Sequence, residues 1–238
     1  MSRYVLKFHK QGYMKYISHL DLLRLFKRSF KRIGIKLQHS QGFNPHPKMS
    51  FVQPLSLGYT SVAEYLEFET ITEEKTNHIM QKLNEATPHG IEILACRLIP
   101  QSKKTLAAMV ECACYELRFQ MDDTCDWSEK IEAFLKQDKI MILKKQKKSK
   151  KYVEQDIKSM IRKLSVQQVD INNNHIMLNA MIDAGSISNL NPEKLLQSFF
   201  DFLGHPFEKE EVSIERKEIF YIKDERLTPI IEMDKEAL

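Results

Sequence analysis

The order in which strand-like and helix-like hydrophobic patterns follow each other constrains the fold of this chain most strongly. Apolar side chains at every second position are typical of strands, and apolar side chains every three or four positions are typical of amphipathic helices. The N-terminal part gives the order strand, helix, strand, strand, helix, strand, in the stretches 4–9, 20–33, 35–39, 64–69, 73–86 and 90–96. This β-α-β-β-α-β order predicts a ferredoxin-like arrangement.

The second half of the chain repeats this order approximately, and 238 residues, 42% of them hydrophobic, are enough for two domains of ordinary size. We therefore predict an α+β protein of two tandem ferredoxin-like (β-α-β-β-α-β) domains with antiparallel sheets. The predicted parts are an N-terminal basic domain at 1–98, a linker at 99–109, a C-terminal domain at 110–223 with a lysine-rich insertion at 144–151, and a charged tail at 224–238.

Composition argues against several classes of protein. No run approaches the roughly 18 apolar residues of a membrane span, and the N-terminus lacks the apolar region of a signal peptide. We therefore expect a cytoplasmic protein without membrane contact. The cysteines form no C-x-x-C pair and no iron–sulfur spacing, so we predict no cofactor. They are Cys96, Cys112, Cys114 and Cys125.

Basic residues are concentrated at the N-terminal end. Residues 1–63 hold eleven Lys and Arg against one acid, Asp21, for a net charge of +10. The 36 basic and 32 acidic residues of the whole chain leave 25 and 31 for the remainder, a net charge of −6. This asymmetry indicates a polyanionic or acidic partner at the N-terminal end. A solvated basic face without a partner is the alternative interpretation.

Much of this charge falls on one side of the first predicted helix. The apolar stripe from Leu20 to Ile33 indicates the buried side, and Gly34 ends the helix. Ser18 followed by Asp21 resembles a capping box at the start. The opposite side is almost purely cationic and offers phosphates a row of contacts; it carries Arg24, Lys27, Arg28, Lys31 and Arg32.

The loop 40–48 follows the second predicted strand and has little conformational freedom. Gly42 permits positive φ, and Pro45 and Pro47 fix φ on either side of His46. A stiff loop loses less entropy on binding, which suits recognition. The alternative interpretation is that the loop is an ordinary tight connection between strands, which has the same composition.

Three motifs carry a resemblance to a known family. They are the stretch 16–21 (Y-I-S-H-L-D), the stretch 42–48 (G-F-N-P-H-P-K), and the pair Gly58 and Glu64. With these motifs the chain resembles the uncharacterised radical-SAM-linked (radical-SAM-associated) family, in its stand-alone form. The resemblance is strong over residues 1–70 and thinner beyond. It implies a radical SAM enzyme as partner, but no established reaction and no catalytic residue.

Three functions fit these observations. The first is a non-catalytic accessory module that binds RNA or another anionic substrate through the basic N-terminal face and the loop. Arginine and lysine would hold phosphates, Phe43 would stack on a base, and Asn44 and His46 would read base edges. The predicted ligand-binding residues are Ser18, His19, Arg24, Arg28, Lys31, Gln41, Phe43, Asn44, His46 and Lys48.

The second function is a metal-independent RNA-processing enzyme. His19 and His46 would be its acid–base pair, with Asp21 or Glu64 orienting one of them. These residues show no tight metal-ligand spacing, so we predict no metal. The third function is a protein–protein adaptor, in which the basic helix meets an acidic surface of the radical SAM enzyme.

Overall fold

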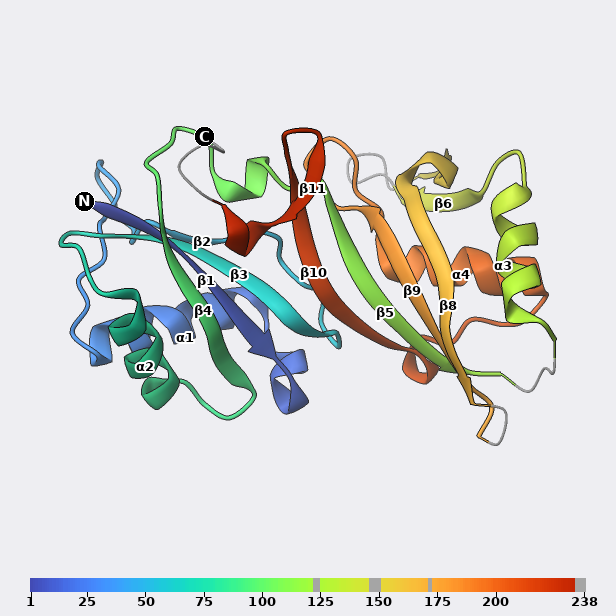
Figure 1. Ribbon diagram of the computed structural model, residues 1–238, viewed down its shortest axis with the longest axis horizontal. Helices are drawn as coiled ribbons and strands as arrows, with labels where there is room; N and C mark the ends of the chain where they lie inside the picture. Colours follow the sequence, from blue (N-terminus) through green and yellow to red (C-terminus); the bar gives the residue numbers. More distant parts are fainter. Residues whose placement is uncertain (122–124, 146–150, 171–172, 234–238) are drawn as a thin grey trace. The chain divides into compact units, whose positions relative to one another are not determined.

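The chain forms two compact units in the computed structural model, which describes residues 1–121, 125–145, 151–170 and 173–233. The N-terminal unit comprises Met1–Glu111 and the C-terminal stretch that begins at Arg216, and the C-terminal unit comprises Cys112–Glu215. Each combines helices with mostly antiparallel strands (Figure 1). The predicted α+β class with antiparallel sheets is confirmed. The tandem ferredoxin-like arrangement and the predicted domain boundaries stay predictions.

A central sheet organises the N-terminal unit. β1 pairs antiparallel with β3 on one side and with β4 on the other, while β2 and β10 are further neighbours of β3, and β11 pairs with β10. The elements are β1 (Ser2–Lys10), α1 (His19–Arg32), β2 (Met49–Phe51), β3 (Thr60–Thr70), α2 (Thr76–Ala86), β4 (Ile91–Ile99), β10 (Ser213–Lys223) and β11 (Arg226–Pro229).

Both helices of this unit pack on one apolar core. Phe26 of α1 lies edge-on to Phe8 of β1, with ring centroids 4.9 Å apart. From α2, Ile79 and Leu83 are completely buried in the same core. Because the side chains of β1 alternate, the residues that this strand contributes to the shared core point to the face that carries the helices; they are Tyr4, Leu6 and Phe8.

The buried side of α1 differs from the predicted stripe. Leu22, Phe26 and Phe30 are buried, whereas Leu20 is 60% exposed. At 3.6 residues per turn, Leu20 lies about 200° around the helix from Leu22 and faces solvent.

The stretch 35–39 forms no regular strand, contrary to the prediction. Leu37 and His39 make only isolated bridges, to Thr70 and Pro47 respectively. The adjacent edge of β3 is instead paired by β2. The Gln38 N–H donates to the Glu69 carbonyl of β3 and not to Lys48, so the bridge between His39 and Pro47 does not extend into a ladder.

In the C-terminal unit β9 pairs antiparallel with β5 on one side and with β8 on the other, and β6 and β7 form a separate hairpin. This hairpin flanks the predicted lysine-rich insertion, of which residues 146–150 lie outside the described residues. No helix in the described ranges has the length and apolar character that crossing a bilayer requires. The elements are β5 (Cys112–Gln120), α3 (Trp127–Lys136), β6 (Met141–Lys145), β7 (Tyr152–Asp156), β8 (Ile161–Asp170), β9 (His175–Asp183) and α4 (Pro192–Leu203).

Candidate functional site

The start of α1 is held by a local hydrogen-bond network. Ser18 is the N-cap, and its hydroxyl oxygen accepts a hydrogen bond from the backbone N–H of Asp21 at 3.1 Å. The same hydroxyl donates to Asp21 Oδ2 at 2.7 Å, and Arg24 Nη1 donates to Asp21 Oδ1 at 2.8 Å. The hydrogen bonds from Ser18 and Arg24 lower the pKa of Asp21 below its ordinary value. The predicted helix cap is confirmed. The hydrogen bonds from Ser18 and Arg24 together occupy both oxygens of the Asp21 carboxylate.

Replacing Ser18 by alanine is expected to lower the free energy of unfolding by about 1 kcal/mol, because the Asp21 N–H would lose its acceptor. Guanidinium chloride unfolding followed by circular dichroism measures this change. Ser18→Thr keeps the hydroxyl and serves as the control. A loss of equal size in both variants would contradict the capping role.

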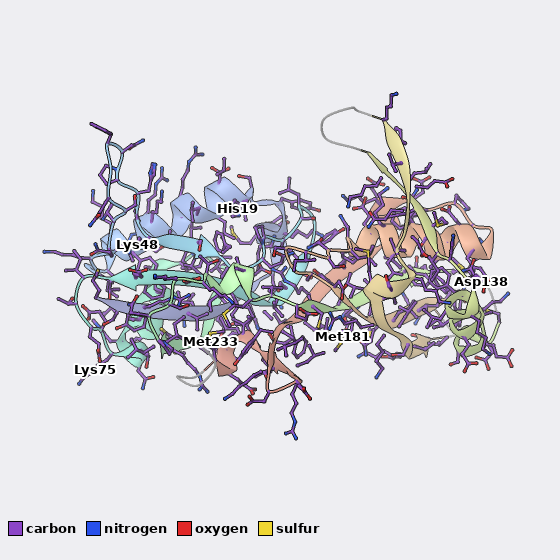
Figure 2. All side chains as sticks on the ribbon, turned by 90° about the horizontal axis from the view of Figure 1, so that it is seen from above. His19, Lys48, Lys75, Asp138, Met181 and Met233 are labelled. Atoms are coloured by element: carbon purple, nitrogen blue, oxygen red, sulfur yellow. The ribbon has the colours of Figure 1, made fainter. Side chains whose placement is uncertain are left out.

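His19 is exposed on the first turn of α1. Its ring lies edge-on to Phe51 of β2, with centroids 5.3 Å apart. Figure 2, in which His19 and Lys48 are labelled, shows the two residues well apart. The cation of Lys48 is engaged, since its Nζ donates to Glu69 Oε2 at 2.9 Å.

Arginines and lysines of α1 lie along two different hollows of the surface. Arg24, Arg28 and Arg32 follow each other at intervals of four residues and line a hollow of about 620 Å³ between α1 and the end of α2. Carboxylates of Asp21 and Glu85 line the same hollow, so its positive charge is partly neutralised.

On the other side of α1 lies a groove of about 550 Å³ toward the base of the loop 40–48. Lys27 and Lys31 of α1 and Lys36 of the following segment line it. No carboxylate lines this groove, and within the described residues none of the three lysines has an ion-pair partner. We call this hollow the lysine groove.

The loop 40–48 is closed at its base and open at its tip. The Ser40 N–H donates to the His46 carbonyl at 2.8 Å, and the His46 N–H donates back to Ser40 Oγ at 3.0 Å. Gly42 has φ of +129°, in the region that favours glycine. The side chains at the tip are exposed, and Phe43 is fully so; they are Gln41, Phe43, Asn44 and His46.

Glu64 does not belong to this exposed surface. It is buried in β3, where its carboxylate is ion-paired with Arg216 of β10. Arg216 also donates to the Gln53 carbonyl at 2.7 Å. Burial lowers the pKa of the neighbouring Lys10, and the charge of Glu64 acts in the opposite direction. Of the predicted candidates, the structure therefore places Glu64 in the core and Asp21 in a helix cap.

Three further cations of residues 1–63 are buried or ion-paired and are not available to a ligand. Arg3 and Lys10 are each 2% exposed. Lys7 Nζ lies 2.6 Å from Glu218 Oε2. The cationic surface is thus smaller than the net charge of the segment suggests. Among the residues that the structure describes, no three His, Cys, Asp or Glu side chains form a group that could hold a metal ion.

Comparison with known proteins places the chain in a family. Residues 3–192 match the family described as "Uncharacterized protein conserved in bacteria (DUF2344)". The chain belongs to this family. Its description names no radical SAM enzyme, so that partner remains a proposal. No curated protein matches the sequence.

Two solved structures align with this DUF2344 protein. A chain of a Cbf5-Nop10-Gar1 complex aligns with a TM-score of 0.53 and 10% identity over 93% of this chain and 50% of that chain. A chain of the archaeal box H/ACA sRNP Nop10-Cbf5 complex aligns with a TM-score of 0.46 and 10% identity, over 90% and 46%. The chain therefore spans about half the length of these neighbours, and the first likeness concerns the fold alone.

Several residues of the lysine groove are absent from the predicted binding residues. The sequence shows Lys27 and Lys36 as basic but not as neighbours, and the predicted binding residues include neither His39 nor Ile71. One signal was present: the alternation Ile35, Leu37, His39 puts the histidine at the end of an apolar row. The contribution of Ile71 depends on tertiary structure, because it follows β3, a distant part of the chain.

Proposed function

We propose that this protein binds RNA or another anionic substrate through the exposed side of α1 and the loop 40–48, as the accessory module of a radical SAM enzyme. The observation that supports binding is a set of three cations, half-buried Lys27 and exposed Lys31 and Lys36, that have no ion-pair partner among the described residues. Lys27, Lys31 and Lys36 surround a groove free of acidic residues, and Arg28 is exposed on the other side of the helix. Phosphate groups neutralise such cations and release counterions.

The exposed loop supports RNA over a simple anion. Phe43 offers a solvent-exposed aromatic ring, on which an unpaired base can stack. Asn44 and His46 lie beside it on the same tip, with side chains able to donate and accept hydrogen bonds. The radical SAM partner rests on the motif resemblance at residues 16–21 and 42–48.

The enzymatic alternative has less support. Asp21 is occupied by Ser18 and Arg24, and Glu64 is buried against Arg216. Neither carboxylate is therefore free to orient His19 or His46, as a histidine acid–base pair requires.

Fluorescence anisotropy with a labelled single-stranded RNA tests the proposal. We expect binding at about 50 mM salt, with an affinity that falls by about 0.7 log unit per log unit of salt for each phosphate contact. Arg28→Gln is expected to weaken binding about fivefold at about 0.1 M salt. Lys136→Gln, in an exposed pair with Glu132 of the C-terminal unit, is the matched control. Absence of binding at low salt would reject RNA as the ligand.

A pull-down from cells with and without nuclease treatment tests the partner. Recovery of a radical SAM enzyme in both samples is expected for a direct contact. Recovery only without nuclease would mean that RNA bridges the two proteins, and no recovery would reject the partnership.

A further inference from the structure

The lysine groove has an apolar floor that is built by the end of α1. Gly34 adopts φ of +78°, and the chain turns so that the Ile35 N–H donates to the Phe30 carbonyl at 3.2 Å. This turn brings Ile35 and Leu37 beside Phe30, and all three are at most 7% exposed. The floor therefore belongs to the core and is rigid before any ligand arrives.

The rim of the groove adds a partly exposed apolar edge and an oriented imidazole. Ile71, just after β3, is 49% exposed, and Pro47 of the loop lines the same groove. His39 Nδ1 is 3.1 Å from the Leu37 carbonyl oxygen, so Nδ1 carries the proton and donates. In the neutral ring Nε2 is then left as a hydrogen-bond acceptor.

We propose that the lysine groove seats one unpaired nucleotide of a single-stranded RNA, with the base on the apolar floor and the flanking phosphates on Lys27, Lys31 and Lys36. This inference rests on the proposed function and names the form of RNA that the site takes. A volume of about 550 Å³ lies in the range of pockets for small molecules and suits one nucleotide, not a duplex. A base inside a duplex is stacked and cannot enter a groove, whereas an unpaired base can.

Charge distribution selects this ligand over an acidic peptide. The three lysines are point charges on flexible stems around an apolar surface, an arrangement that combines phosphate contacts with burial of a flat base. The neighbouring arginine hollow also has apolar lining residues, such as Leu25, but the carboxylates of Asp21 and Glu85 reduce its positive charge.

Fluorescence anisotropy with matched single-stranded and blunt duplex RNA separates the contributions of charge and of base contacts to the binding affinity. Lys27→Gln, Lys31→Gln and Lys36→Gln are each expected to weaken single-strand binding about fivefold at about 0.1 M salt and to reduce the salt slope by about 0.7. Ile71→Ser changes no charge, so it is expected to weaken binding several-fold and leave the salt slope unchanged. Lys136→Gln is again the control for loss of an exposed lysine. Circular dichroism melting of each variant checks that it is folded.

Cross-linking with 4-thiouridine-substituted RNA locates the base. Adducts at residues 35–39 or at Ile71 are expected. Adducts confined to the loop tip around Phe43, or equal affinity for duplex and single strand, would overturn the groove assignment and leave RNA binding intact. If the protein without substitutions binds no RNA, that result would instead overturn the proposed function. Competition by an acidic peptide as strong as that by RNA would assign the groove to a protein partner.

Discussion

Replacing Glu64 by glutamine is expected to lower the free energy of unfolding by about 3–5 kcal/mol, the cost of leaving buried charge without its partner. The carboxylate pairs with Arg216, and the two side chains are 2% and 1% exposed. Lys10 is buried beside them and is also attracted by Glu64. Glutamine keeps the size of the side chain, so the loss would report charge and not a cavity. Denaturant unfolding followed by circular dichroism measures it.

The same variant is expected to change the dependence of stability on pH. Desolvation lowers the pKa of Lys10 from its ordinary 10.5, and Glu64 partly offsets this shift. Between the lowered value and 10.5 the unfolded state binds more protons than the folded state, so stability rises with pH in that window. Without Glu64 the pKa of Lys10 falls further and the window widens. The deficit of Glu64→Gln should therefore be smaller at about pH 10 than at about pH 7.

Glu85→Gln provides the matched control. Glu85 is exposed and pairs with Lys82 on α2, a pair of the kind that contributes little to stability. We expect no change in its unfolding midpoint. A similar midpoint for Glu64→Gln and Glu85→Gln would contradict the role assigned to the buried pair.

Replacing Arg3 by alanine is expected to lower the free energy of unfolding by about 3 kcal/mol, because the guanidinium of this β1 residue holds β3 and the segment 100–106, which follows β4. It donates to Glu67 Oε1 at 2.7 Å, to the Pro100 carbonyl at 2.9 Å and to the Lys104 carbonyl at 2.8 Å. The other oxygen of Glu67 accepts from the Leu106 N–H at 2.8 Å. Truncation would leave these partly buried acceptors without their donors and release the segment 100–106.

Two measurements separate this effect from a general loss of stability. Denaturant unfolding gives the size of the change, and limited trypsin digestion is expected to cut faster after Lys103 and Lys104. Arg3→Lys keeps the charge but lacks the planar fork, so we expect an intermediate loss. Arg24→Ala removes an arginine from an exposed pair and is expected to leave both measurements unchanged. Unchanged proteolysis in Arg3→Ala would contradict the role of Arg3 in holding the segment 100–106.

Local signals predicted α1 and its boundaries well. The apolar repeat, the Ser18 cap and Gly34 each act over a few neighbouring residues, and each is visible in the sequence. The missing strand at 35–39 shows the limit of the same method. An alternating stretch becomes a strand only when a partner edge accepts it, and β2 pairs with that edge of β3 instead.

Only part of the candidate site was predicted, and the reason is similar. Periodicity put Arg28 and Lys31 on the exposed side of α1, and composition marked the loop 40–48 as stiff. Periodicity does not report that Lys27, Lys36 and His39 share a groove with Ile71. That neighbourhood forms only when the end of β3 packs beside the end of α1.

By itself, the sequence determined the α+β class, the first helix with its cap, and an excess of positive charge in the first quarter of the chain. Tertiary structure alone decided which cations remain available to a ligand. Arg3 and Lys7 are neutralised by Glu67 and Glu218, which lie 64 and 211 positions away. Helix and strand patterns depend on neighbours in sequence, whereas the pairing of charges depends on distance in space, and only the folded chain sets that distance.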